Sequence, residues 1–130
     1  MYDLWCAKAP PGILPRRSAF NPAELPHLLP YITIFDVARE PMRFRIRLVG
    51  TAIVDAMGVD TTGMWLDELD NIANVHRRAE AMADTGKPYS LCDLPLTWTH
   101  RDFKRYSVLG LPLADDGRTV DKLLYTMLFE

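Results

Sequence analysis

The sequence predicts an α+β fold in which a sheet carries its helices on one face. Residues 43–48 (Arg-Phe-Arg-Ile-Arg-Leu) alternate arginine with a large apolar residue, a period typical of a strand with one buried face. Two predicted strands come first, followed by three helical pieces and then three more strands. Because strands and helices fall into separate runs, the order disfavours a doubly wound parallel sheet and indicates α+β.

The N-terminal segment is rich in proline. Six of the ten prolines lie in residues 1–30, a density that excludes a long helix or a central strand there. Asn21 followed by Pro22 is typical of a helix start, and we expect a short helix that ends before Pro30. Its leucines need an apolar surface to cover. We therefore expect residues 1–30 to form a docked N-terminal cap on a core of residues 31–130.

The core elements are predicted from hydrophobic period and turn residues. The connection at 39–42 is short enough for a hairpin. Gly58 and Gly86 are typical of helix ends, and Asn71 is expected to cap the longest helix. Asp115-Asp116-Gly117 predicts a turn between the last two strands. The predicted elements are strands at 31–38 and 43–51, a short helix ending at Gly58, a helical segment at 64–69, a helix from Asn71 to Thr85, and strands at 89–98, 103–113 and 122–129.

Charged residues are expected mostly on the outside. The arginines of residues 43–47 are interpreted as a solvated strand face, partly paired with acidic neighbours across strands; contact with an anion or a nucleic acid is the alternative. The apolar face predicted for the longest helix consists of Ile72, Val75, Ala79, Met82 and Ala83. We expect its solvent side to hold mostly Arg77, Arg78, Glu80 and Asp84.

Composition bounds the class of protein. The chain has 130 residues, which favours one domain, and 48% of them are hydrophobic, as in ordinary globular proteins. A formal net charge of −2 gives no general attraction to nucleic acid or to an anionic membrane. No apolar run approaches the ~20 residues that a bilayer needs, and no signal peptide is visible, so a cytoplasmic location is expected. Cys6 and Cys92 are interpreted as free thiols, with Cys92 a small hydrophobic residue of the core.

Motifs of common catalytic and metal sites are missing from the sequence. It contains no Gly-x-Ser-x-Gly, no Gly-rich phosphate loop, and no histidine at zinc-site spacing. His76 lies one position from Val75 on the longest predicted helix, from where it could reach inward as an axial haem ligand. We favour a histidine at the edge between helix and solvent, and we expect neither haem nor flavin.

Because catalytic and metal-site motifs are missing, apolar side chains are the main candidates for a functional site. Those between the sheet and its helices line either a packed core or a small-molecule pocket. The last strand and the leucines of 109–113 are apolar on the other sheet face, which we expect the N-terminal cap, a second subunit or both to cover. The candidate pocket-lining residues are Phe44, Ile46, Leu48, Ile53, Met57, Trp65, Val75, His76, Met82, Leu94, Trp98, Tyr106 and Met127.

Three segments resemble a known family. Phe-Arg-Ile-Arg-Leu-Val-Gly-Thr (44–51), Gly-Val-Asp-Thr-Thr-Gly-Met-Trp-Leu (58–66) and the leader Leu-Pro-Arg-Arg-x-x-Phe-x-Pro (14–22) are similar to those of short PAS-like proteins, known mainly from alphaproteobacteria. The resemblance implies a five-stranded antiparallel sheet in the order 2-1-5-4-3, with helices on one face. It also implies a sensory or interaction role, a ligand or cofactor in the core, and pairing through the sheet and an N-terminal helix. The cysteine motif of flavin photosensors is absent.

The leading hypothesis is a regulatory PAS-like module without enzyme activity. We expect it to form a homodimer through the sheet and the N-terminal cap, to bind a small molecule, and to act on a separate output protein. The alternative from another class is a small cone-shaped α+β enzyme, an isomerase or dehydratase with Asp93 and His100 as an acid–base pair. A dimerisation domain with a dry core is a third hypothesis. A carboxylate or imidazole pointing into the cavity would distinguish the enzyme from the sensor.

Overall fold

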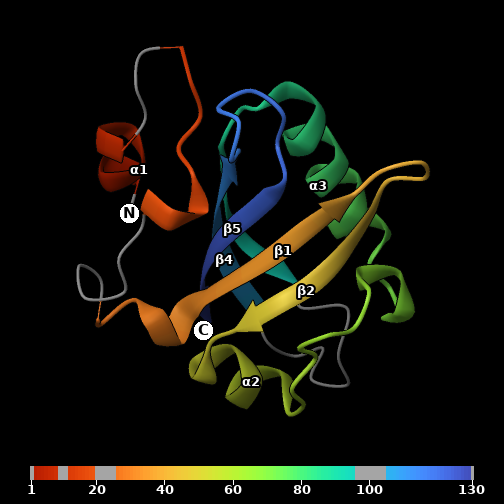
Figure 1. The fold of residues 1–130 in the computed structure, drawn as a ribbon. Coiled ribbons are helices and arrows are strands. Elements are labelled where there is room, and N and C mark those ends of the chain that lie inside the picture. The colour runs from red at the N-terminus through yellow and green to blue at the C-terminus, as the bar shows by residue number, and fades with distance from the viewer. Residues whose placement is uncertain (1, 9–11, 20–25, 96–104, 130) are drawn as a thin grey trace.

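One antiparallel sheet forms the centre of the molecule (Figure 1). The computed structural model describes residues 2–8, 12–19, 26–95 and 105–129. The strand order is β2-β1-β5-β4-β3, which confirms the predicted α+β fold and its PAS-like topology. The strands are β1 (Ile32–Ala38), β2 (Arg43–Val49), β3 (Tyr89–Pro95), β4 (Arg105–Leu113) and β5 (Lys122–Phe129).

Helices α2 (Thr51–Met57) and α3 (Ala73–Thr85) belong to the inner side of the sheet, together with the 3₁₀ turn η4 (Leu66–Glu68). As predicted, Gly58 and Gly86 end the two helices in the left-handed conformation, where glycine avoids the Cβ clash. The prediction that Asn71 caps α3 is wrong. Ile72 occupies the N-cap, and Asn71, with a φ of 58°, turns the chain before the helix begins.

The N-terminal residues cover the opposite face of the sheet, with α1 (Tyr2–Lys8) lying across from α3 (Figure 1). The Trp5 side chain is buried there, and its Nε1–H donates to the carbonyl oxygen of Pro112 at 2.9 Å. Around Trp5 lies an outer cluster of buried side chains. This outer cluster consists of Trp5, Ile32, Ile34, Leu111, Leu113 and Leu124.

The sequence did not predict α1. Most of the helix expected at residues 21–29 falls outside the described residues, and the part that is described is a turn followed by the 3₁₀ helix η3 (Leu29–Tyr31). Pro30 lies within η3, a separate 3₁₀ helix that begins at Leu29. Proline is tolerated in a first helical turn, where its missing N–H has no partner to lose.

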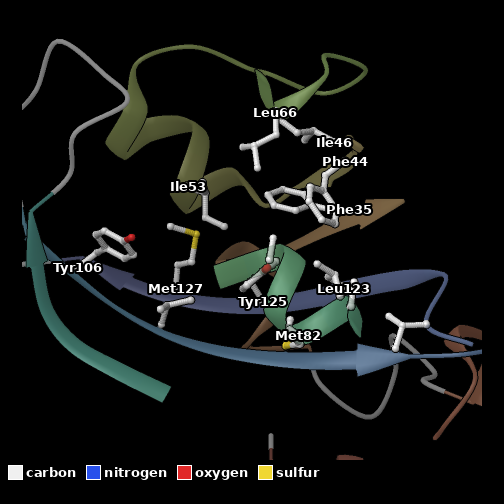
Figure 2. Close-up of a cluster of buried hydrophobic side chains, with 14 of the residues drawn as sticks. Phe35, Phe44, Ile46, Ile53, Leu66, Met82, Tyr106, Leu123, Tyr125 and Met127 are labelled. Atoms are coloured by element: carbon white, nitrogen blue, oxygen red, sulfur yellow. The ribbon is translucent and has the colours of Figure 1, made fainter. Parts of the chain in front are cut away.

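The inner face of the sheet holds the larger hydrophobic core, which packs between the strands and α2, α3 and η4 (Figure 2). Phe44 of β2, Met82 of α3 and Leu123 of β5 are almost completely buried in it. Cys92 is not part of this core. Its side chain is exposed, because a register shift between Leu91 and Leu94 breaks the inward–outward alternation of β3. The interpretation of Cys92 as a core residue is therefore wrong, although both cysteines are free thiols as predicted.

Candidate functional site

A cavity of about 50 Å³ lies between the inner face of the sheet and the helices. All five strands contribute to its wall, and α2, α3 and the chain between them close the other side. Ten of the sixteen lining residues are apolar, and Arg78 is the one with a charged side chain. The lining residues are Thr33, Phe35, Ile46, Val49, Ile53, Met57, Thr61, Leu66, Leu69, Val75, Arg78, Tyr89, Tyr106, Val108, Tyr125 and Met127.

Six of the thirteen residues proposed from the sequence line this cavity, and Figure 2 shows several of them. Phe44 and Met82 are instead buried in the surrounding core, and Leu94 packs against that core while partly exposed. Trp98 lies outside the described residues. The six that line the cavity are Ile46, Ile53, Met57, Val75, Tyr106 and Met127.

Leu48 does not share the inward face of Phe44 and Ile46, so that prediction is wrong. Leu48 pairs with Ile34 whereas Ile46 pairs with Phe35, which leaves Arg47 as an extra residue in β2. An extra residue reverses the alternation beyond it. Leu48 is therefore 38% exposed, and its neighbour Val49 lines the cavity in its place.

Trp65 also lies away from the cavity lining. Its ring is partly buried beneath two guanidinium groups, with Arg43 Cζ 4.2 Å and Arg45 Cζ 5.9 Å from the ring centre. Arg43 also forms an ion pair with Asp67 at 2.7 Å. The two arginine contacts hold Trp65 against the arginine face of β2. The backbone of Trp65 also forms a β-bridge with Arg45.

The predicted pairing of the β2 arginines with acidic residues is confirmed in part. Arg47 pairs across the hairpin with Asp36 of β1, with an Nε–Oδ2 distance of 2.7 Å. The Arg43 partner, Asp67, comes from η4 and not from a neighbouring strand. Arg45 donates to the carbonyl oxygen of Gly63 at 3.2 Å. Arg43 and Arg45 therefore connect the edge strand β2 to the segment that follows α2, whereas Arg47 connects it to β1.

His76 occupies the edge of α3. Its Nδ1 lies 2.6 Å from Glu80 Oε1, one helical turn further on, and its ring meets the Phe44 ring edge-on at a centroid distance of 5.2 Å. His76 is absent from the cavity lining. The interpretation of His76 as a histidine between helix and solvent agrees with this position.

Five residues with polar groups on the cavity wall are absent from the sequence-based prediction: Thr33, Thr61, Arg78, Tyr89 and Tyr125. The expectation that Arg78 lies on the solvent side of α3 is wrong, because Arg78 lines the cavity. Its position gave a usable signal, since it lies three residues after Val75 and four before Met82, both on the apolar face. No signal of this kind singled out Tyr89 and Tyr125 from the other aromatic residues of the strands.

Arg78, three tyrosines and the hydroxyls of Thr33 and Thr61 supply the polar groups of the cavity wall. Arg78 Nη2 donates to the Tyr106 hydroxyl at 3.2 Å. Burial raises the pKa of the Tyr89, Tyr106 and Tyr125 phenols, most strongly that of Tyr125, while the positive charge of Arg78 acts on each in the opposite direction. Arg78 Nε is buried without a hydrogen-bond partner in the described structure, and the buried Tyr125 hydroxyl has only the Tyr89 phenol beside it as a partner.

Acid–base and metal chemistry find little support in the described residues. No aspartate, glutamate or histidine is among the residues that line the cavity. Asp93, half of the proposed catalytic pair, is exposed and forms an ion pair with Arg105, while His100 lies outside the described residues. The described ranges also contain no group of three histidine, cysteine or acidic side chains that could hold a metal ion. Within the same ranges, each helix is too short or too polar to cross a bilayer.

Comparison with known families identifies the chain. The model of a PAS domain family matches residues 1–127. The chain belongs to the PAS domain family. This confirms the resemblance seen in the sequence. A search of curated proteins found no match.

Solved structures show the same PAS fold. The Rhodobacter sphaeroides LOV protein aligns with a TM-score of 0.57 and 13% identity, over 75% of this chain and 57% of that one. A light-oxygen-voltage domain studied with a flavin analogue aligns with a TM-score of 0.60 and 12% identity, over 83% of this chain and 82% of that one. The PAS domain of histidine kinase ThkA aligns with a TM-score of 0.53 and 15% identity, over 74% of this chain and 97% of that one. At these identities the likeness concerns the fold alone.

Proposed function

We propose that this PAS domain is a sensory module that binds a small molecule in the cavity between its sheet and α2 and α3. The observation that carries the proposal is a cavity with a mainly apolar wall and a few polar groups, the usual character of a small-molecule site. Membership of the PAS family supports a signalling role. A cavity of about 50 Å³ is smaller than the roughly 300–1,000 Å³ typical of drug-sized ligands, so a very small ligand fits the proposal best.

A non-catalytic role is part of the proposal. The cavity wall offers one guanidinium, three phenols and two threonine hydroxyls, with no carboxylate or imidazole to act as a general base near neutral pH. The alternative of an isomerase or dehydratase depends on Asp93, whose side chain is directed to Arg105 and is 67% exposed. We therefore favour the sensor over the enzyme.

Homodimerisation through the sheet and the N-terminal segment, and output through a separate protein, stay predictions. The apolar outer sheet face that suggested a partner is covered within a single chain by Trp5 and its neighbours. Size-exclusion chromatography with light scattering tests the dimer: a monomer at all concentrations would rule out this interface.

A cavity-filling substitution tests the proposed function. Val75 of α3 lines the cavity, so Val75→Phe is expected to occupy it and to abolish small-molecule binding, whereas Ala81→Phe places the same ring on an exposed position of α3. Native mass spectrometry of protein from its own host, and thermal shifts with a library of small organic molecules, provide the readouts. Retention or binding by the wild type and Ala81→Phe but not by Val75→Phe is expected. Equal behaviour of all three proteins would contradict the proposal.

A further inference from the structure

Arg78 is a cavity residue whose charge lacks a counter-ion in the described structure. Its Nε is buried without a hydrogen-bond partner, and its other nitrogens interact with neutral phenols, with Nη2 donating to the Tyr106 hydroxyl at 3.2 Å. The ion pairs of the described residues do not include Arg78. Burying part of a guanidinium without an anion is unfavourable, because the lost hydration is not replaced. The arrangement is complete only when an acceptor lies beside it.

Tyr125 supplies a second donor on the same wall. Its hydroxyl is buried and has only the neutral Tyr89 phenol as a neighbouring partner in the described structure, and its ring meets the Tyr89 ring edge-on at 6.3 Å. Arg78 lines the same cavity as Tyr89, Tyr106 and Tyr125, although the three tyrosines come from different strands. A tyrosine hydroxyl and a guanidinium both donate hydrogen bonds, so their common partner is an oxygen anion.

Apart from Tyr89, Tyr106 and the hydroxyls of Thr33 and Thr61, the rest of the wall is hydrocarbon and thioether. Ile53 and Met57 of α2 and Met127 of β5 line it, and no second cation accompanies Arg78 among the lining residues. One guanidinium fork matches one carboxylate, whereas a phosphate dianion leaves a negative charge unpaired here. One water molecule occupies about 10–15 Å³ of cavity volume measured in this way. The cavity of about 50 Å³ therefore holds about three to five water molecules, or one molecule of about four to six non-hydrogen atoms.

We propose that the cavity binds a short-chain monocarboxylate, whose carboxylate accepts hydrogen bonds from Arg78 and the Tyr125 hydroxyl and whose hydrocarbon end contacts Ile53, Met57 and Met127. This assignment rests on the proposed function, because it names the class of ligand for the same cavity. A single bound carboxylate supplies an acceptor for the unsatisfied Arg78 Nε and a charged acceptor for the Tyr125 hydroxyl.

The test compares an acid with its neutral isostere. Propionate and propionamide are titrated into the wild type, Arg78→Met, Tyr125→Phe and the control Arg77→Met, whose side chain is exposed one position earlier on α3. Affinity is followed by saturation-transfer NMR and by thermal shift. The wild type and Arg77→Met are expected to bind propionate at least tenfold more tightly than propionamide, and Arg78→Met to lose at least tenfold in propionate affinity. Tyr125→Phe is expected to lose severalfold.

Other outcomes separate this inference from the proposed function. Equal binding of propionate and propionamide, unchanged in Arg78→Met, would overturn the carboxylate assignment and leave the cavity as a binding site for neutral molecules. Inorganic phosphate that binds more tightly than propionate would overturn it in the same way. If Arg78→Met does not fold, the comparison of acid with amide in the wild type, and the Tyr125→Phe result, decide the question. Failure of both probes and of the wider library, with no retained molecule, would contradict the proposed function itself.

Discussion

Trp5 offers a direct test of how the N-terminal segment is held on the sheet. It is 9% exposed, lies in the outer cluster on β1, β4 and β5, and donates to the Pro112 carbonyl oxygen at 2.9 Å. A buried tryptophan removes about 150–250 Å² from water, which corresponds to roughly 4–6 kcal/mol at 25 cal/mol per Å². That sum is an upper bound, because the unfolded chain already buries part of its surface. We therefore expect Trp5→Ala to lower the free energy of unfolding by about 3–5 kcal/mol.

Trp5→Phe separates packing from hydrogen bonding. Phenylalanine keeps most of the apolar contact but leaves the buried Pro112 oxygen without its donor, so we expect a smaller loss of about 1–3 kcal/mol. Cys6→Ala, at the next and exposed position of α1, is the control and should change stability by less than about 0.5 kcal/mol.

Urea denaturation followed by far-ultraviolet circular dichroism measures these free energies, and gel filtration reports self-association. With Trp5 removed, the apolar side chains of the outer cluster become accessible, so Trp5→Ala should also elute earlier or aggregate. A Trp5→Ala protein as stable as the wild type, and with the same elution, would show that α1 does not dock on the sheet in solution.

Three further predictions concern other parts of the fold. Gly50→Ala should lower the free energy of unfolding, measured by urea denaturation, by at least about 1–3 kcal/mol, because the new Cβ would lie 2.3 Å from the Pro30 backbone oxygen. The control Thr51→Ala, at the exposed next position, should lower it by less than about 0.5 kcal/mol. Equal losses in the two variants would refute the close approach. Trp65→Ala should cost only about 1–2 kcal/mol, since the ring is partly buried under two arginines; a loss above about 3 kcal/mol would place the ring in the core instead. Burial raises the pKa of the Tyr125 phenol above its ordinary value of 10.0, so the unfolded chain releases this proton first and the free energy of unfolding should fall as the pH rises past about 10. Unfolding measured between about pH 8 and 11 should show a smaller fall in Tyr125→Phe, and identical slopes would contradict the burial of this phenol.

Local patterns predicted the elements of the core well. The alternation that buries Phe44 and Ile46, the glycines that end α2 and α3, and the turn at Asp115–Gly117 all depend on short-range chemistry, and each occurs where expected. The strand order came from the resemblance to the PAS family and not from the patterns themselves, since pairing between distant strands leaves little trace in any one segment.

The residues that were misplaced depend on tertiary structure. Leu48 turned outward because Arg47 is an extra residue in its strand, a feature that no alternation pattern reveals. Arg78 was assigned to solvent by its charge, although its spacing from Val75 places it on the cavity side of α3. Helix α1 was missed because a helix of seven residues is marginal alone and depends on the docking of Trp5 for its stability.

The most direct measurement of the central claim is the response of methionine methyl groups to propionate. Met57 and Met127 line the cavity, whereas Met42 and Met64 pack against the core elsewhere and serve as internal references. In ¹³C-methyl NMR spectra, we predict saturable shifts of the Met57 and Met127 signals in the wild type and their loss in Arg78→Met. Unchanged Met57 and Met127 signals at the highest propionate concentration, or equal shifts of all four methyl groups, would contradict a carboxylate site in this cavity.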